Sequence, residues 1–173
     1  MSLNYFELFG LKPIFNIDLA TLESNFRKIQ SDSHPDRFVI ASAAGKLSAM
    51  QRATLANEAY QCLKNPANRA QYLLELQGIT AIGETNTAMP KDFLMQQMEW
   101  REVAEEATAA KDITALENLL EEIRVGAKNL QADLVSLLDV RKDYLTATDA
   151  TRKLIFIEKV SEDINSAIAL IDI

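Results

Sequence analysis

The residues best able to do chemistry in this chain are His34, Pro35 and Asp36, which follow one another directly. His34 is the only histidine among 173 residues, and an imidazole is the side chain that ordinarily exchanges a proton near neutral pH. Pro35 cannot continue a helix and pushes its predecessor toward extended geometry. The tripeptide is therefore compatible with an acid–base pair, with a recognition tip, or with a plain helix end followed by a polar loop.

Two predicted helices position this tripeptide. The first is expected over residues 19–32, where large apolar side chains recur at 3-4-3 spacing after a capping aspartate: Asp18, then Leu19, Leu22, Phe26 and Ile29. The second is expected from about Lys46 to Leu63, after an irregular link over 37–45. Joined through the tripeptide, the two helices form an antiparallel pair with the loop at its tip. Arg27 and Lys28 lie off the apolar stripe and are expected to face solvent near that tip.

The rest of the first half is also predicted to be helical. A short aromatic-rich helix is expected over 5–11 and another over 67–77, each closed by a glycine, Gly10 and Gly78. Residues 78–89 are rich in small and polar side chains, which is typical of a linker. The predicted division is a first domain over 1–77, a linker over 78–89 and a helical domain over 90–173.

The helix expected from Pro90 to about Lys111 carries apolar side chains on two faces. One arc of its helical wheel is the predicted core face: Phe93, Trp100, Val103, Ala104 and Ala107. A second arc, mixed with glutamates, holds Leu94, Met95 and Met98. One helix cannot bury both arcs in a small bundle, so the second is either a partner site or a scatter of exposed apolar residues.

Two further helices complete the predicted second domain. The first has an apolar seam at 3-4-3-4 spacing: Ile113, Leu116, Leu120, Ile123, Ala127, Leu130, Leu134 and Leu137. A turn is expected over 143–149, and the last helix has the stripe Ile157, Val160, Ile164, Ile168 and Ile171 with Phe156 at its edge. Three long amphipathic helices predict an antiparallel three-helix bundle, although such a seam could equally serve a dimer.

Composition predicts an all-α protein and excludes several classes. Aromatic and β-branched residues do not cluster in alternating runs, so no strand is expected. Residues 1–78 carry a net charge of +1 and residues 79–173 carry −8, which argues against non-specific nucleic-acid binding. One histidine and one cysteine, Cys62, predict no disulfide, no metal site and no cofactor. With no apolar run near ~20 residues and no leader-like start, a cytoplasmic protein is expected.

Four blocks in the first half resemble the J-domain of DnaJ-type co-chaperones, in order and at similar spacing. They are Tyr5-Phe6-x-Leu8-Phe9-Gly10, Phe26-Arg27-Lys28-Ile29, His34-Pro35-Asp36-Arg37 and the run from Asn57-Glu58-Ala59-Tyr60 to Arg69-Ala70-x-Tyr72. The resemblance implies that the tripeptide contacts a DnaK-type chaperone and stimulates its ATP hydrolysis. By position, His34, Pro35 and Asp36 make that contact, with Arg27 and Lys28 as docking charges.

The combination of a J-domain with a short acidic helical domain resembles the HscB family of iron–sulfur cluster assembly. Phe93-Leu94-Met95-x-Gln97-x-Glu99-x-Arg101-Glu102 and Arg152-Lys153-Leu154-x-Phe156 are similar to segments of that family. The resemblance implies an ATPase partner of the HscA type and a scaffold partner, IscU. The implied scaffold-binding residues are Leu94, Met95, Met98, Glu99, Glu102 and Phe156, of which the wheel had already singled out the first three.

The sequence therefore predicts a co-chaperone and not an enzyme. It is expected to stimulate the ATPase of HscA and to deliver IscU; a co-chaperone of a general DnaK with a different client is the alternative. An acid–base enzyme built on His34 and Asp36 lacks a nucleophile motif, a phosphate loop and metal ligands. A helix-turn-helix nucleic-acid binder is opposed by the acidic charge.

Overall fold

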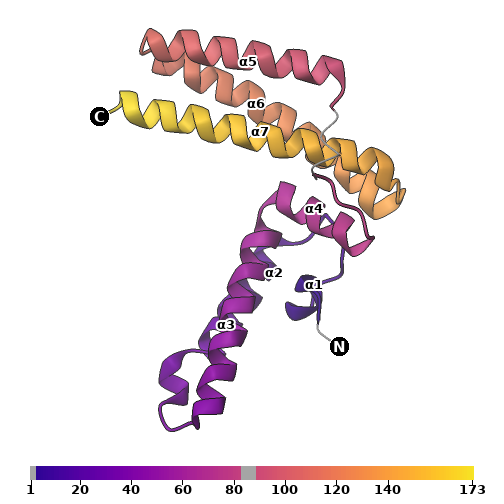
Figure 1. Cartoon of the computed structure of the whole chain (residues 1–173), viewed down its shortest axis with the longest axis vertical. Coiled ribbons are helices and arrows are strands. Elements are labelled where there is room, and N and C mark those ends of the chain that lie inside the picture. The colour runs from indigo at the N-terminus through magenta and orange to yellow at the C-terminus, as the bar shows by residue number, and fades with distance from the viewer. Residues whose placement is uncertain (1–2, 83–88) are drawn as a thin grey trace. The chain divides into compact units, whose positions relative to one another are not determined.

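The computed structural model describes residues 3–82 and 89–173, and every regular element in that part of the chain is helical (Figure 1). The predicted all-α class is confirmed. The chain separates into two compact units, Met1–Leu73 and Leu74–Ile173. Of the linker predicted over 78–89, residues 83–88 lie outside the described residues.

The first unit begins with α1 (Tyr5–Leu8), α2 (Leu19–Asp32), the 3-10 turn η1 (Pro35–Phe38) and α3 (Ala43–Lys64). It then enters α4 (Pro66–Leu76), which crosses from one unit into the next. Asp18 caps α2 by accepting a hydrogen bond from the Ala20 backbone N–H at 3.0 Å. Leu22, Phe26 and Ile29 are buried as the stripe predicts, whereas the first turn leaves Leu19 49% exposed.

The link predicted to be irregular over 37–45 is the main departure in this unit. The Ser42 hydroxyl accepts a hydrogen bond from the Gly45 N–H at 3.1 Å, so α3 begins at Ala43 instead of Lys46. Pro35 starts the 3-10 turn just before it. The serine cap and the proline-initiated turn each act over only a few residues. Together they order a stretch in which apolar residues do not recur at helical spacing.

Aromatic packing fixes the α2/α3 hairpin. Phe26 of α2 stacks on Tyr60 of α3 with ring centroids 4.1 Å apart, and Phe9 meets Phe26 edge-on at 6.4 Å. The Asn25 amide donates to the Phe9 carbonyl at 2.8 Å. Such ring pairs stabilise beyond their buried area, so they hold α2 and α3 together below the tip of the hairpin.

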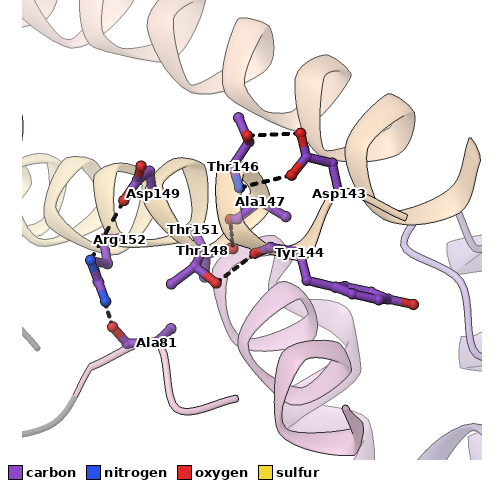
Figure 2. Close-up of polar contacts among 9 residues, drawn as sticks. All are labelled: Ala81, Asp143, Tyr144, Thr146, Ala147, Thr148, Asp149, Thr151 and Arg152. Carbon is purple, nitrogen blue, oxygen red and sulfur yellow. Dashed lines mark hydrogen bonds and ion pairs between the residues drawn. The ribbon is translucent and has the colours of Figure 1, made fainter. Parts of the chain in front are cut away.

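The second unit contains three long helices, each antiparallel to the next (Figure 1): α5 (Lys91–Ala109), α6 (Ile113–Leu134) and α7 (Tyr144–Ile171). Between the last two lies a π-helical turn, η2 (Val135–Val140). The turn predicted over 143–149 is wrong. Asp143 accepts hydrogen bonds from the Thr146 backbone N–H at 3.2 Å and hydroxyl at 2.8 Å, and this cap starts α7 at Tyr144 (Figure 2).

The core of the bundle is drawn from all three helices: Trp100 and Ala107 of α5, Leu116, Leu119 and Ile123 of α6, and Ile157, Val160 and Ile164 of α7. Phe93 and Ala104 pack against it as expected. Val103, assigned to the core by the wheel, is 44% exposed, while Gln97 is buried. α5 turns the stripe of residues 93, 97, 100, 104 and 107 inward, which leaves Val103 at its edge.

A buried arginine ties the segment after α4 to the bundle. Arg152 on α7 is 6% exposed, and its Nε donates to the Ala81 carbonyl at 2.6 Å (Figure 2). Its guanidinium also lies 3.5 Å from the Asp149 carboxylate. A buried cation needs such partners, and a buried carbonyl needs a donor, so each group satisfies the other.

Candidate docking surfaces

The tripeptide is presented at the start of η1, between α2 and α3. His34 is the residue that caps the turn: its Nδ1 accepts a hydrogen bond from the Asp36 backbone N–H at 3.2 Å. A ring nitrogen that accepts carries no proton, so the neutral imidazole holds its proton on Nε2. Pro35 occupies the first position of the turn, where its missing N–H costs nothing.

Both ionisable groups of the tripeptide are open to water. The side chain of His34 is 59% exposed and that of Asp36 is 89% exposed. Nδ1 lies 3.5 Å from the Asp36 carboxylate, which makes an ion pair only when the imidazole is protonated. The tip thus offers a fixed N–H donor and a carboxylate acceptor in high-dielectric surroundings. That arrangement suits recognition better than catalysis, which gains most where water is excluded.

A surface groove of about 670 Å³ runs beside the tripeptide between α2 and α3. His34 and Pro35 line it together with Arg27, two turns earlier on α2. Arg27 is exposed and forms an ion pair with Glu23 at 2.7 Å. Lys28 is exposed but is not among the lining residues.

Sequence reasoning missed the α3 wall of this groove. Ala53, Thr54 and Asn57 line it opposite Arg27 and His34. Their spacing puts these three residues on one face of α3, and this was the only sign in the sequence that they could line a common surface. It carries little hydrophobic contrast, so periodicity alone does not distinguish it from any solvated face.

The second set of predicted site residues forms an exposed apolar face on α5. Leu94 is 44% exposed, Met95 53% and Met98 69%. Glu99 and Glu102 are exposed on the same helix. We call Leu94, Met95, Met98, Glu99 and Glu102, together with Phe156, the docking face. Large apolar groups left in water beside carboxylates are typical of a partner site.

Phe156 lies on α7, where it is half-buried. α5 and α7 run in the same direction (Figure 1). The Lys153 ammonium lies over the Phe93 ring, 5.9 Å from its centroid, and Arg101 and Val160 line one groove between the two helices. Residue 156 falls between residues 153 and 160, so it lies at the same level along the bundle as the turn of α5 from Leu94 to Met98.

The described part of the chain holds no group of three or more histidine, cysteine, aspartate or glutamate side chains placed to bind a metal ion. No helix among the same residues is long and apolar enough to cross a bilayer.

The chain is similar along almost its whole length to curated co-chaperones. It is 50% identical over 165 residues to the co-chaperone protein HscB homolog of Burkholderia thailandensis, covering 95% of this chain and 94% of that protein. The chain belongs to the HscB co-chaperone family. A family model described as the HSCB C-terminal oligomerisation domain matches residues 89–165.

Solved structures of HscB proteins have the same fold. Chaperone HscB from Vibrio cholerae superposes with a TM-score of 0.85 at 39% identity, covering 98% of this chain and 99% of that one. Human co-chaperone HscB superposes with a TM-score of 0.87 at 27% identity, covering 95% and 81%. HscB proteins are J-domain co-chaperones of iron–sulfur cluster assembly, so the predicted co-chaperone role is confirmed at the level of the family.

Proposed function

We propose that this HscB-family chain couples two partners. The tripeptide tip stimulates ATP hydrolysis by a DnaK-type chaperone of the HscA kind, and the bundle delivers the iron–sulfur scaffold IscU to it. The observation that carries the proposal is the exposed His34-Pro35-Asp36 turn, which is held by its own hydrogen bond at the end of a rigid hairpin. A bacterial cytoplasmic setting is part of the proposal, because the curated relatives are bacterial.

The chemistry of the tip supports docking on an acidic ATPase surface. Arg27 and Lys28 offer two exposed cations on α2 beside the tripeptide, in a first half whose net charge is close to zero. Complementary charge steers association and fixes register more than it adds affinity. The Nε2–H of His34 and the carboxylate of Asp36 then make short-range contacts with the ATPase.

Stimulation without catalysis follows from linkage. A protein that binds the hydrolysis-competent state of the ATPase better than its other states shifts that equilibrium by the difference in affinity. In this proposal His34 and Asp36 supply that difference, and the bond-breaking groups belong to the ATPase. HscB homologues are co-chaperones, which agrees with this division of labour.

The chemistry of the docking face supports a scaffold with an apolar, basic surface. Leu94, Met95 and Met98 offer side chains that lose water contact on docking, and Glu99 and Glu102 add two carboxylates beside them. Methionine is flexible and polarisable, so it adapts to an irregular partner surface.

A crossed experiment tests both arms at once. Single-turnover ATP hydrolysis by HscA and calorimetric binding of IscU are measured for wild type, His34→Gln and Met98→Ala. His34→Gln is expected to lower the stimulation about tenfold or more, the loss of a hydrogen bond to a charged group, while IscU binding is unchanged. Met98→Ala is expected to weaken IscU binding and to leave the stimulation unchanged. Each variant is therefore the control for the other.

Equal stimulation by wild type and His34→Gln would contradict the role of the tip. Repeating the assay with a general DnaK distinguishes the two kinds of ATPase partner. Stronger stimulation of DnaK than of HscA would favour a general co-chaperone with a different client.

A further inference from the structure

A second hollow in the bundle lies between α5 and α7, beyond the docking face. It is a groove of about 510 Å³, which is within the ~300–1,000 Å³ of typical ligand pockets. Its floor is apolar: Val160 and Ile164 are buried, and Ala104 and Ala167 are half-buried. Small side chains on facing turns leave the space that larger ones would fill.

The groove continues the docking face along the same two helices. On α5, Leu94, Met98, Arg101, Glu105 and Thr108 follow one another at 4-3-4-3 spacing, so they share one stripe, and the last three line the groove. At 1.5 Å per residue this stripe is about 21 Å long.

The α7 wall continues the docking face in the same way. Phe156, Val160, Asp163 and Ala167 follow at 4-3-4 spacing, and the last three line the groove. The docking face and the groove therefore follow one another along α5 and α7, with large apolar side chains at the first and a hollow at the second.

The rim of the groove is charged. Glu105 on α5 and Asp163 on α7 are both exposed, and the same rim carries one cation, Arg101. Glu102 lies one turn from Glu105 on a neighbouring stripe of α5, so carboxylates outnumber cations beside the groove. The occupant is therefore expected to place apolar groups on the floor of the groove and basic groups against its rim.

This charge decides between two occupants. A second copy of the chain seated by a symmetric contact would set the acidic rim against itself, and opposed like charges cost affinity. A basic surface on a different protein meets no such cost. We propose that the α5/α7 groove is the second half of the scaffold-binding site and receives an apolar segment of the scaffold that carries lysine or arginine.

The inference rests on the proposed function, because it assumes that the docking face binds the scaffold. Residues two to three turns further along α5 and α7 then also contribute to the affinity for the scaffold and to the salt dependence of that binding. The docking face alone would give affinities insensitive to those residues.

Charge reversal and filling of the groove test the inference. IscU binding to the full-length protein is measured by calorimetry for Glu105→Lys, Asp163→Lys and Ala109→Arg, which places a bulky cation at an exposed lining position. Each is expected to weaken binding about threefold to tenfold and to flatten its salt dependence, because rim charges act through steering and screening.

Matched controls lie on α6, which contributes no lining residue to this groove. Glu117→Lys makes the same charge change as the two reversals, and Ala132→Arg makes the same change of size and charge as Ala109→Arg; both positions are exposed. These controls are expected to bind IscU within about twofold of wild type, since exposed positions away from an interface are nearly neutral.

The outcomes separate the inference from the proposed function. If wild type binds IscU and Met98→Ala weakens it, while the groove variants bind like their controls, the groove is not part of the site and the inference is overturned. If wild type does not bind IscU, the scaffold arm of the proposed function fails first. If sedimentation shows wild-type self-association that the groove variants abolish, the occupant is a second copy, and this also overturns the inference.

Discussion

Truncation of Met98 gives the sharpest test of the docking face. The residue is 69% exposed, so about two-thirds of its surface can be buried by a partner. Burying a whole methionine side chain is worth roughly 1.5–3 kcal/mol, which gives about 1–2 kcal/mol for this share. Met98→Ala is therefore expected to weaken scaffold binding about 5- to 30-fold.

The same reasoning ranks its neighbours. Met95 is 53% exposed and Leu94 is 44% exposed, so the loss of affinity on truncation to alanine is expected to decrease in the order Met98, Met95, Leu94. Leu145→Ala is the matched control, because this residue of α7 is 82% exposed but lies outside the docking face. Its truncation is expected to leave scaffold binding unchanged.

Stability separates a docking residue from a core residue. Met98→Ala removes groups that are already in water, so the free energy of unfolding in urea is expected to change by less than about 0.5 kcal/mol. Trp100, two residues along α5, is 7% exposed, and Trp100→Ala is expected to cost ~3–5 kcal/mol. Unchanged scaffold affinity in Met98→Ala, or a loss of stability comparable to that of Trp100→Ala, would refute the reasoning.

Two further predictions concern α7. Arg152→Met keeps the aliphatic stem but leaves the fully buried Ala81 carbonyl without its Nε donor, so the free energy of unfolding in urea is expected to fall by about 1–3 kcal/mol. Exposed Lys159→Met is the control, and equal stability of the two variants would contradict this expectation. The hydrogen bonds from Thr146 hold the pKa of Asp143 below its ordinary value of 3.8, so its stabilising contribution is complete above that value and is lost as pH falls through the lowered pKa. Asp143→Asn is expected to flatten the fall of the unfolding temperature between about pH 5 and about pH 2, and an unchanged slope would show that the cap does not contribute.

Much of this protein could be predicted from local pattern. The stripe of Leu22, Phe26 and Ile29 and the cap at Asp18 gave the bounds of α2 as the structure has them. The His34-Pro35-Asp36 tripeptide could be predicted to end the preceding helix and to form the turn at the hairpin tip, because proline cannot continue a helix. Two arcs of apolar residues on one helix implied that one of them stays in water, and Leu94, Met95 and Met98 do.

Other features depended on which helices pack together. The wheel of α5 placed Val103 in the core arc, but packing against α6 and α7 leaves Val103 exposed and buries Gln97 at the other edge of that arc. The departures over 143–149 and 37–45 have a local cause instead, because the Asp143 and Ser42 side chains cap α7 and α3 and start both helices earlier than the apolar periods indicate.

The sequence by itself determined the helices, the exposed tripeptide and the unpaired apolar arc, since each follows from the order of residues within one turn or one period. Only the tertiary structure decided that Phe156 lies at the level of Leu94 and Met98 along the bundle, that Arg152 satisfies Ala81, and that small side chains of α5 and α7 line one groove. These are relations between segments about 50 to 70 residues apart. Their register is set by the packing of three helices around one core, which no single-helix period contains.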